Sequence, residues 1–224
     1  MNIHEDKWLI TGAAGFIGSH IVASLLQKGI KVVGLDNFST GDQSRLDSAL
    51  AKVDMKFQNN FEFVKADILD EMMLRKVTAG IRYISHQAAL VSAPDSISKP
   101  MEYLDVNLKG FISVAMAAIA NKVKRIVYAS SSSVYGSNIS CPLKEDDPTY
   151  PLTPYATTKK ACEDFAYTFA GNSETSFVGL RYFNVFGPEQ NIGGGYGAVI
   201  PSWIVKAISN KIPEIYGDPN STRD

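Results

Sequence analysis

Three glycines at a spacing of three, Gly12, Gly15 and Gly18, constrain the fold of this chain more than any other feature. A short apolar run at 7–11 precedes them, and apolar residues with helical periodicity follow over 15–28. In such a strand–loop–helix unit the glycines permit a sharp turn and a close approach to a pyrophosphate, which the helix N–H groups then bind. The context therefore predicts a dinucleotide-binding loop, although the spacing alone would equally describe three turn glycines.

Strands and helices alternate along the first 184 residues. Runs rich in β-branched and apolar residues predict strands, and runs with a period of about 3.6 predict the helices between them. The expected strands are 7–11, 31–36, 61–67, 81–86, 125–130 and 176–182, and the expected helices are 15–28, 41–55, 70–77, 101–121 and 153–170. Right-handed crossovers between such strands give an α/β fold with a doubly wound, Rossmann-type parallel sheet.

Residues 185–224 differ in texture from the rest. A run of three glycines at 193–195 and four prolines interrupt them around one expected helix at 198–209. We expect 1–184 to form the dinucleotide-binding domain and 185–224 to begin a smaller substrate-binding region. Because the chain ends before that region could form a core of its own, we expect it to be a fragment of a longer protein.

The composition excludes some classes of partner. A formal net charge of -1 at pH 7 gives no reason to expect binding to nucleic acid or to an anionic membrane. Acidic residues stand where a signal peptide would be basic, and no apolar stretch approaches the roughly 20 residues that span a bilayer. Cys141 and Cys162 have no metal-binding spacing, so we expect no metal site and two reduced thiols in a cytoplasmic protein.

Polar residues at strand ends indicate which cofactor would bind. Asp36 follows Gly18 by eighteen positions, where a carboxylate accepts hydrogen bonds from a ribose 2′-OH and repels a 2′-phosphate, which favours NAD over NADP. Asp67 is placed either to approach adenine or to cap the next helix. His86 is expected to be buried and satisfied rather than catalytic. Asn107, polar within an apolar helix, either braces the neighbouring loop or contacts the cofactor.

Hydroxyl groups and a Tyr/Lys pair follow the fifth expected strand. Ser131, Ser132 and Ser133 lie at the carboxyl edge of the sheet, where ligands of open α/β sheets bind. Tyr155 and Lys159 stand four apart, on one face of an expected helix. A neighbouring ammonium, together with an oxidised nicotinamide, lowers the pKa of a phenol. We therefore predict that Tyr155 is a base, and a turn that satisfies its own backbone is the alternative for the serines.

Taken together, these motifs resemble those of the extended short-chain dehydrogenase/reductase superfamily, most closely its nucleotide-sugar 4-epimerases. The resemblance covers residues 7–224. It rests on the glycine loop, on the Tyr155/Lys159 pair, and on the segments 36–41, 86–89, 131–136, 180–187 and 222–224.

The resemblance implies NAD as the cofactor and assigns residues to it by position. Tyr155 and Lys159 would act at the nicotinamide end, which Tyr182 would also approach, and Ser131 matches the family's catalytic hydroxyl. The residues implied to contact NAD are Gly12, Gly15, Phe16, Ile17, Gly18, Asp36, Asn37, Ser39, Thr40, Gly41, Asp67, Ile68, Gln87, Ala88, Ala89, Asn107, Tyr155, Lys159 and Tyr182.

A nucleotide-sugar substrate and a homodimer are implied in the same way. The residues implied to contact the substrate are Ser92, Ser131, Ser132, Ser133, Tyr155, Asn184, Val199, Tyr216 and Arg223. A guanidinium such as that of Arg223 suits a diphosphate. Relatives pair two long helices, here 101–121 and 153–170, in a helix bundle between two copies. Packing on their own sheet explains these apolar helices equally well.

The reaction implied is 4-epimerisation. Related dehydratases carry an Asp-Glu pair after the catalytic hydroxyl and decarboxylases carry a Glu, whereas Ser132 and Ser133 stand there in this chain. Segments 87–92, 131–133 and 198–203 resemble those of enzymes for N-acetylated sugars, so we expect a UDP-N-acetylhexosamine (UDP-GlcNAc/UDP-GalNAc) as substrate. The alternatives are a UDP-glucose 4-epimerase, a 4,6-dehydratase, a decarboxylase and a non-catalytic nucleotide-binding protein.

Overall fold

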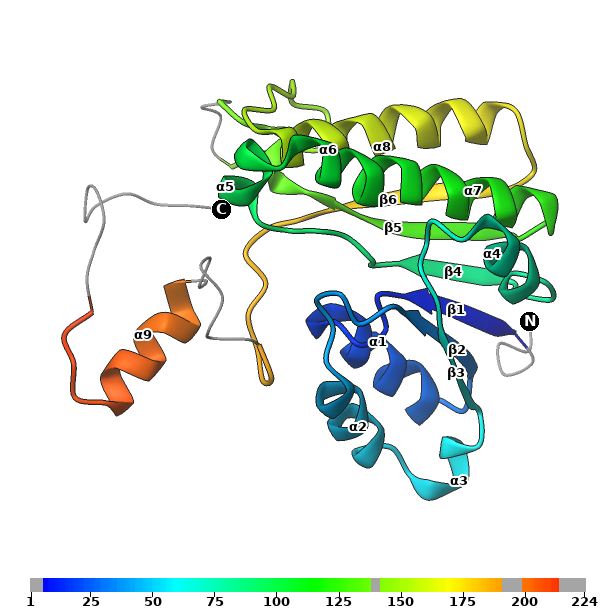
Figure 1. The fold of residues 1–224 in the computed structure, drawn as a ribbon, viewed down its shortest axis with the longest axis horizontal. Coiled ribbons are helices and arrows are strands. Elements are labelled where there is room, and N and C mark those ends of the chain that lie inside the picture. Colours follow the sequence, from blue (N-terminus) through cyan, green and yellow to red (C-terminus); the bar gives the residue numbers. More distant parts are fainter. Residues whose placement is uncertain (1–5, 138–141, 191–198, 214–224) are drawn as a thin grey trace.

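The computed structural model describes residues 6–137, 142–190 and 199–213. In it, a six-stranded parallel sheet carries helices on both faces (Figure 1). The strands are β1 (Lys7–Thr11), β2 (Lys31–Asp36), β3 (Phe61–Lys65), β4 (Tyr83–His86), β5 (Arg125–Ser131) and β6 (Ser176–Tyr182), in the order β3-β2-β1-β4-β5-β6 across the sheet. The strand order reverses between β1 and β4, which confirms the predicted doubly wound fold.

Strand β1 is buried from both sides because its residues alternate between two apolar layers. Leu9 packs with Val33 on one face, and Ile10 packs with Val32 on the other. Along its two edges β1 pairs in parallel with β2 and with β4. Its carboxyl end at Thr11 is therefore fixed at the centre of the sheet, and the glycine loop begins there.

Helices complete each apolar layer. The Ile10 layer is covered by α1 (Phe16–Gln27) and α2 (Gln43–Ala51), and the Leu9 layer by α4 (Glu71–Val77), α7 (Gly110–Ala120) and α8 (Pro154–Gly171). Phe111 of α7 is the largest side chain among the fully buried ones, with 1% exposure. Its ring lies 5.0 Å from that of Tyr128 and 5.8 Å from that of His86, which ties α7 to β4 and β5.

Several element boundaries differ from the sequence prediction. The expected helix 41–55 is two helices, α2 and α3 (Met55–Gln58), because the buried Val53 enters the core between them. The expected strand 61–67 ends at Lys65, so Asp67 lies in the following turn. Helix α5 (Ala93–Ser98) and the 3-10 turn η3 (Ser132–Val134) were not predicted, since elements this short contain too few repeats for a periodicity to appear.

The expected helix 101–121 is continuous but not uniform. Helix α6 (Pro100–Tyr103) leads into a π-helical segment, η2 (Leu104–Lys109), and then into α7. The full run, Pro100–Ala120, has 21 residues and is long and apolar enough to cross a bilayer, with half of its most apolar window buried inside the protein. The expectation that no apolar stretch approaches this length was therefore wrong. The partial burial of the run Pro100–Ala120 against the sheet is that of a core helix.

Helix α9 (Val199–Ile208) lies apart from the sheet (Figure 1). It occupies most of the expected helix 198–209. Its Trp203, Ile204 and Ile208 are exposed by 39%, 53% and 78%. The division of the chain into two regions at residue 184 stays a prediction.

Replacing Phe111 by Ala should lower the free energy of unfolding by about 3–5 kcal/mol, because the cavity left in a packed core collapses only in part. Tyr167→Ala is the control, since that aromatic side chain on α8 is 85% exposed, and it should cost less than about half as much. Denaturant titrations followed by circular dichroism measure both losses. Equal losses for the two variants would contradict the assigned core.

Candidate active site

The glycine loop approaches the end of β4 so closely that side chains are excluded. At Gly12, where φ is +70°, a Cβ would lie 2.7 Å from the backbone N of Ala88. At Gly18 a Cβ would lie 2.0 Å from the Gly12 carbonyl oxygen. Gly15 is the N-cap of α1 and provides no side-chain cap, so the N–H groups of the first turn keep no intrahelical partner. This cradle fits the pyrophosphate of a dinucleotide.

The carboxylate of Asp36 is held beside the glycine loop by two backbone donors. Its Oδ2 accepts from the N–H of Ala14 at 2.9 Å, and its Oδ1 accepts from the N–H of Phe38 at 2.8 Å. A Cβ at Gly41 would lie 2.9 Å from Asp36 Oδ1, so the turn before α2 also closes on this group. Each oxygen keeps acceptor capacity for a ribose hydroxyl, which fits NAD.

Asn37 and Asp67 join the loops that follow β2 and β3. Asn37 Nδ2 donates to Asp67 Oδ2 at 2.8 Å, and Asn37 Oδ1 accepts from the N–H of Ser39 at 2.9 Å. Asp67 Oδ1 accepts from the N–H of Leu69 in its own turn at 2.8 Å, whereas helix α4 is capped by Asp70. The alternative in which Asp67 caps the helix is therefore wrong.

The other residues expected near the adenosine half differ in exposure. Ile68 is only 5% exposed and its side chain packs at Gly110, so its predicted contact with adenine stays a prediction. Thr40 is exposed in the turn before α2. Phe16 and Ile17, the first residues of α1, are half-buried where the glycine loop meets the helix.

The segment after β4 forms the other side of the crevice. The N–H of Ala88 donates to Thr11 Oγ1 at 3.3 Å, and the N–H of Gln87 donates to the Thr11 carbonyl at 3.1 Å. The small side chains of Ala88 and Ala89 leave room along this floor. At the end of β6, burial raises the pKa of Tyr182, and its interaction with the Gln87 side chain opposes that rise. Gln87 thus links the β4 and β6 sides of the site.

His86 holds the end of β4 to β1. Its Nδ1 lies 2.7 Å from Thr11 Oγ1 within a buried contact. Burial, aided by the charge of Lys159, lowers the pKa of His86 to about 3. The imidazole is therefore neutral at pH 7 and braces the strand that leads into the glycine loop, which agrees with the predicted buried and satisfied histidine.

Tyr155 lies in the first turn of α8, which Thr153 caps and Pro154 begins. Its N–H donates to Ser96 Oγ of α5 at 3.1 Å, a contact not predicted because α5 was not. The Tyr155 side chain is 8% exposed, and it lies near enough to Ser131, the last residue of β5, for that hydroxyl to oppose the rise in the pKa of Tyr155 that burial causes. The structure thus brings the phenol and a serine hydroxyl together at the carboxyl edge of the sheet.

The serine tract is ordered around Ser131. Ser131 Oγ accepts from the N–H of Ser133 at 3.1 Å and so caps the short turn η3. Ser132 and Ser133 are half-buried within that turn. The tract therefore satisfies its own backbone, as the structural alternative held, and it also offers the Ser131 hydroxyl to Tyr155.

Lys159 lies one turn further along α8 and is 5% exposed. Its Nζ donates to the Ala129 carbonyl at 2.9 Å and stands 5.9 Å from the centre of the Tyr155 ring. Burial lowers the pKa of Lys159 and raises that of Tyr155, although the neighbouring Ser131 hydroxyl opposes the second effect. The prediction that Lys159 and an oxidised nicotinamide together lower the phenol pKa stays a prediction, because it includes the charge of a bound cofactor.

Asn107 braces the crevice from the η2 segment. Its Oδ1 accepts from the N–H of Leu90 at 2.8 Å, and its Nδ2 donates to the Leu90 carbonyl at 3.0 Å. Nδ2 also donates to Thr158 Oγ1 of α8 at 3.3 Å. Both ends of the amide are thus engaged by the protein, as the bracing alternative requires, and a contact with the cofactor stays a prediction.

The expected substrate residues are placed only in part. Ser92 Oγ caps α5 at its N-terminus. Asn184 is exposed just beyond the end of β6. Tyr216, Arg223 and the side chain of Val199 lie outside the described residues.

The two cysteines differ in what the structure describes. Cys162 is a buried, free thiol on α8 that donates to the Asn107 carbonyl at 3.4 Å. Burial raises its pKa to about 11, so the thiol is neutral at pH 7. Cys141 lies outside the described residues.

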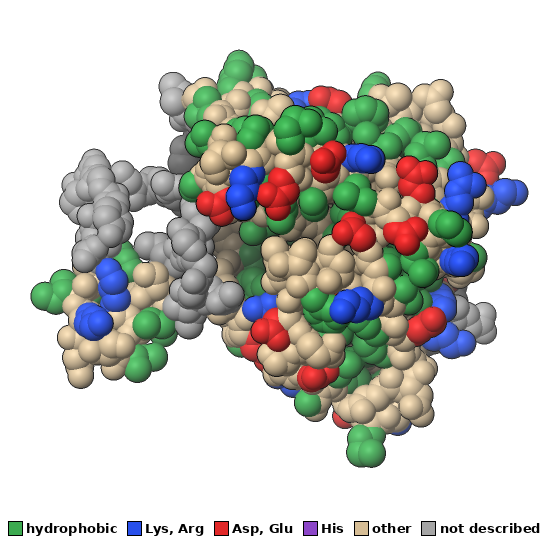
Figure 2. Space-filling model, viewed as in Figure 1, with side chains coloured by type: hydrophobic (Ala, Val, Ile, Leu, Met, Phe, Trp, Pro, Cys, Tyr) green, Lys and Arg blue, Asp and Glu red, His purple; other side chains and the backbone are tan. Residues whose placement is uncertain are grey.

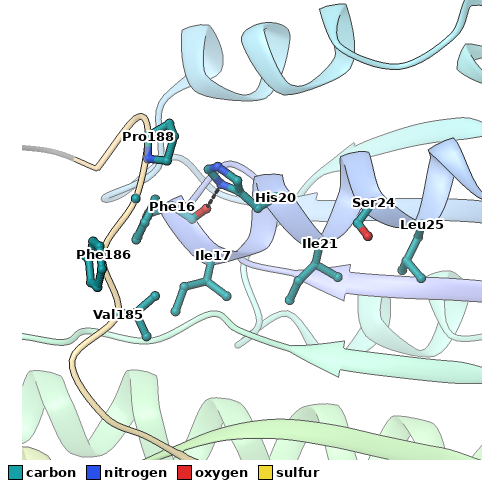
Figure 3. A pocket seen from close by; sticks show the side chains of 10 residues that line it. Phe16, Ile17, His20, Ile21, Ser24, Leu25, Val185, Phe186 and Pro188 are labelled. Carbon is teal, nitrogen blue, oxygen red and sulfur yellow. Dashed lines mark hydrogen bonds between the residues drawn. The ribbon is translucent and has the colours of Figure 1, made fainter.

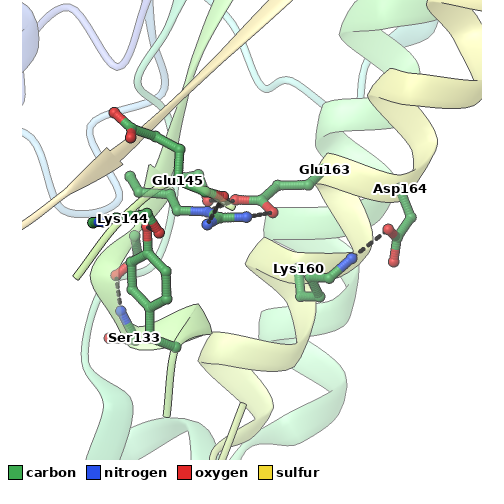
Figure 4. Close-up of polar contacts among 10 residues, drawn as sticks. Ser133, Lys144, Glu145, Lys160, Glu163 and Asp164 are labelled. Atoms are coloured by element: carbon green, nitrogen blue, oxygen red, sulfur yellow. Dashed lines mark hydrogen bonds and ion pairs between the residues drawn. The ribbon is translucent and has the colours of Figure 1, made fainter. Parts of the chain in front are cut away.

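An ion pair not predicted from the sequence fixes α8 to the sheet (Figure 4). Arg181 of β6 donates through Nε and Nη2 to the two oxygens of Glu163, each at 2.9 Å. Ser130 Oγ donates to Glu163 Oε1 at 2.6 Å, and the Arg181 guanidinium lies 4.7 Å from the centre of the Tyr135 ring. The signal available in the sequence was that Glu163 follows Lys159 by four residues. This spacing places the Glu163 side chain on the same helix face as Lys159.

Comparison with known proteins agrees with this geometry. A family model described as the NAD dependent epimerase/dehydratase family matches residues 8–224. The chain belongs to that family. The predicted place in the short-chain dehydrogenase/reductase superfamily is thereby confirmed, and NAD dependence is a property by which the family is described.

Similar proteins are named as nucleotide-sugar 4-epimerases. A putative UDP-glucose 4-epimerase of Methanocaldococcus jannaschii is 35% identical over 218 residues, 96% of this chain and 68% of that protein. A solved UDP-N-acetylglucosamine 4-epimerase of Methanobrevibacter ruminantium M1, in complex with UDP-N-acetylmuramic acid, is 37% identical with a TM-score of 0.87, covering 95% of this chain and 66% of that one. The UDP-glucose 4-epimerase of Thermotoga maritima, solved with UDP-glucose, is 30% identical with a TM-score of 0.85 and the same coverage, 95% and 66%. This chain thus spans about two thirds of the length of each.

The pH dependence of stability tests the buried, neutral state of His86. Its folded-state pKa of about 3 lies below the ordinary 6.5, so its contribution is complete above pH 6.5 and is lost as the pH falls toward 3. Through this residue the free energy of unfolding should fall by up to about 1.4 kcal/mol per pH unit in that window. Denaturant titrations of His86→Gln should give a flatter profile than wild type. Parallel profiles would show that the histidine is not buried in its neutral form.

Proposed function

We propose that the protein is an NAD-dependent nucleotide-sugar 4-epimerase that acts on a UDP-N-acetylhexosamine (UDP-GlcNAc/UDP-GalNAc). The observation that carries this proposal is the buried phenol of Tyr155 beside the buried Ser131, at the carboxyl edge of a sheet whose glycine loop fits a dinucleotide. Membership of the family and the names of the similar proteins support the reaction class.

Tyr155 is the base of the proposed reaction. Its buried phenol takes the proton of the sugar C4 hydroxyl, and the neighbouring Ser131 hydroxyl assists that transfer. NAD, when bound, supplies the acceptor and later the donor of the C4 hydride, and it brings a positive charge to the site. After the 4-keto sugar has turned its other face to Tyr155, the proton returns and C4 is inverted.

In this proposal, ionisation of Tyr155 depends on the positive charge of a bound cofactor. Because burial raises the pKa of the phenol, the protein's own groups keep it protonated at neutral pH. A positive charge beside it shifts the balance toward the phenolate. Lys159 uses one ammonium proton on the Ala129 carbonyl and keeps two donors, which suit the hydroxyls of a ribose.

The contacts of the Glu163 carboxylate, next to the serine tract, favour epimerisation over dehydration or decarboxylation. Glu163 bonds Ser130, but both of its oxygens are engaged by Arg181. With Ser130 and Arg181 on its oxygens, this carboxylate is already engaged within the protein and is not presented to a substrate. With Ser132 and Ser133 at the positions where a dehydratase carries acids, the site suits a reaction that needs a single base.

The choice of sugar rests on resemblance. Segments 87–92, 131–133 and 198–203 resemble those of enzymes for N-acetylated sugars, and one similar structure is named as a UDP-N-acetylglucosamine 4-epimerase. UDP-glucose is the second candidate, because the M. jannaschii and T. maritima proteins are named for it.

We also propose that the protein is a cytoplasmic homodimer. Hydrophobic side chains lie exposed over α6 to α8 in the upper part of Figure 2. Met101, Met116 and Phe165, one from each helix, are exposed by 67%, 54% and 39%. Pairing with the same helices of a second copy would bury these side chains in a helix bundle.

Sedimentation at micromolar concentration should therefore give twice the mass of the chain, and a monomer at that concentration would argue against the bundle.

Turnover of two sugars tests the reaction and the substrate. The purified protein is incubated with NAD and either UDP-GlcNAc or UDP-glucose, and the products are followed by NMR. UDP-GalNAc should accumulate until the two epimers reach equilibrium. Turnover of neither sugar overturns the proposal, whereas a stable keto product or released CO₂ supports a dehydratase or a decarboxylase. Binding of NADH without turnover supports a non-catalytic nucleotide-binding protein.

Removal of the phenol oxygen should separate chemistry from binding. Tyr155→Phe should lower the epimerisation rate by at least about 10³-fold, and Ser131→Ala by about 10²-fold, because each removes part of the proton transfer. Tyr167→Phe is the matched control, since that phenol on α8 is 85% exposed, and its rate should stay at the wild-type level. NADH fluorescence titrations should give similar affinities for all of these proteins. A Tyr155→Phe variant that retains full activity would remove the tyrosine from the mechanism.

A further inference from the structure

Residues 183–190, here called the strap, leave the end of β6 and run toward α1 and α2 on the other half of the molecule (Figure 1). Glu189 of the strap accepts hydrogen bonds from Arg45 and Ser48 of α2. Helix α2 follows β2, and β2 and β6 lie on opposite sides of the point between β1 and β4 where the strand order reverses. A segment that joins these two halves along the carboxyl edge passes over the crevice in which a dinucleotide binds. The strap therefore forms a roof over the predicted cofactor site.

The strap meets α1 at its first turn, next to the glycine loop. A Cβ at Gly187 would lie 3.5 Å from Cζ of Phe16. Figure 3 shows Pro188 beside Phe16 and His20, on the side of α1 that faces the strap. Apolar side chains of α1 and of the strap, including Phe186, line a cavity of about 400 Å³ between them. The roof thus lies directly over the helix N-terminus that would bind the pyrophosphate.

Glu189 fastens the strap to α2. Its Oε1 accepts from Ser48 Oγ at 2.8 Å and from the ammonium of Lys52. The Glu189 carbonyl accepts from Arg45 Nε at 3.2 Å, while Arg45 Nη1 donates to the carbonyl of Ala14 in the glycine loop at 3.2 Å. Arg45 therefore holds the roof and the phosphate cradle at the same time.

The contacts between Glu189 and α2 are long-range in sequence, and they can break at modest cost in free energy. It joins positions between 137 and 144 residues apart, and Glu189 has a φ of +65°, a strained conformation for a residue with a side chain. Contacts with α2 must therefore hold that backbone in place. Lys52 is 57% exposed, and Glu189 Oε2 is buried with no hydrogen-bond partner in the described part of the chain. An ion pair with one solvated partner opens at modest cost.

We propose that Glu189, Ser48 and Lys52 form a latch that keeps the strap closed over bound NAD and slows its release. This inference rests on the cofactor site of the proposed function. In an epimerase the hydride returns in every cycle, so a cofactor that stays bound is used repeatedly, and slow release favours turnover. Glu189 is a positioning residue and has no part in the chemistry.

Release of NADH tests the latch directly. Protein loaded with NADH is mixed with excess NAD, and the decay of NADH fluorescence gives the release rate. Glu189→Ala and Lys52→Ala should each accelerate release by roughly tenfold. Lys56→Ala is the matched control, because Lys56 is an exposed lysine of the neighbouring helix α3 that pairs with Asp54 at 3.8 Å. Its release rate should stay within about twofold of wild type.

A charge swap distinguishes the latch from a general structural role. The double variant Glu189→Lys/Lys52→Glu should return release to within about threefold of wild type, and amide hydrogen exchange over 185–190 should rise in the single variants and fall again in the double variant. Unchanged release in both single variants overturns the latch. A wild-type protein that binds no NADH overturns the cofactor site and the latch together. If the protein converts neither sugar but the single variants still release NADH faster than wild type, the latch is supported and only the proposed reaction is overturned.

Discussion

The backbones of Gly12 and Ala88 pass so close to each other that no side chain fits between them. Because this contact is allowed, the glycine loop, the end of β4 and the first turn of α1 can converge at the reversal of the strand order. Thr11 secures the junction, since its hydroxyl contacts His86 and accepts from the N–H of Ala88. The histidine is kept neutral by burial, so it holds the junction without adding charge beside the phosphate cradle.

Helix α8 organises the other half of the site. Ser96 fixes its first turn, and the pair of Glu163 with Arg181 fixes its middle to β5 and β6. Between these anchors burial acts in opposite directions on the pKa of Tyr155 and that of Lys159, and in each case favours the neutral form. The tyrosine thus keeps its proton at neutral pH, and in the proposed reaction the positive charge of bound NAD would favour its loss.

The fold was largely predictable because its signals are local: apolar runs, helical periods and glycine breaks placed all six strands. The glycine loop, Asp36 and the Tyr155/Lys159 pair were likewise visible in short motifs. What could not be predicted depends on contacts between distant parts of the chain, such as Glu163 with Arg181 and Glu189 with α2. The burial of Tyr155 and the contact of Lys159 with the Ala129 carbonyl were not predicted either, since spacing along a helix shows neither depth of burial nor where an ammonium points.

The π-helical segment η2 makes the run from α6 to α7 sensitive to its exact number of residues. Each residue of an α-helix turns the next by about 100°, so loss of a single residue in η2 would rotate all of α7 about its axis. Phe111 would leave its place against Tyr128 and His86, and a different stripe of side chains would face β4 and β5. The residue count of this run is therefore under tighter constraint than the identity of its exposed side chains.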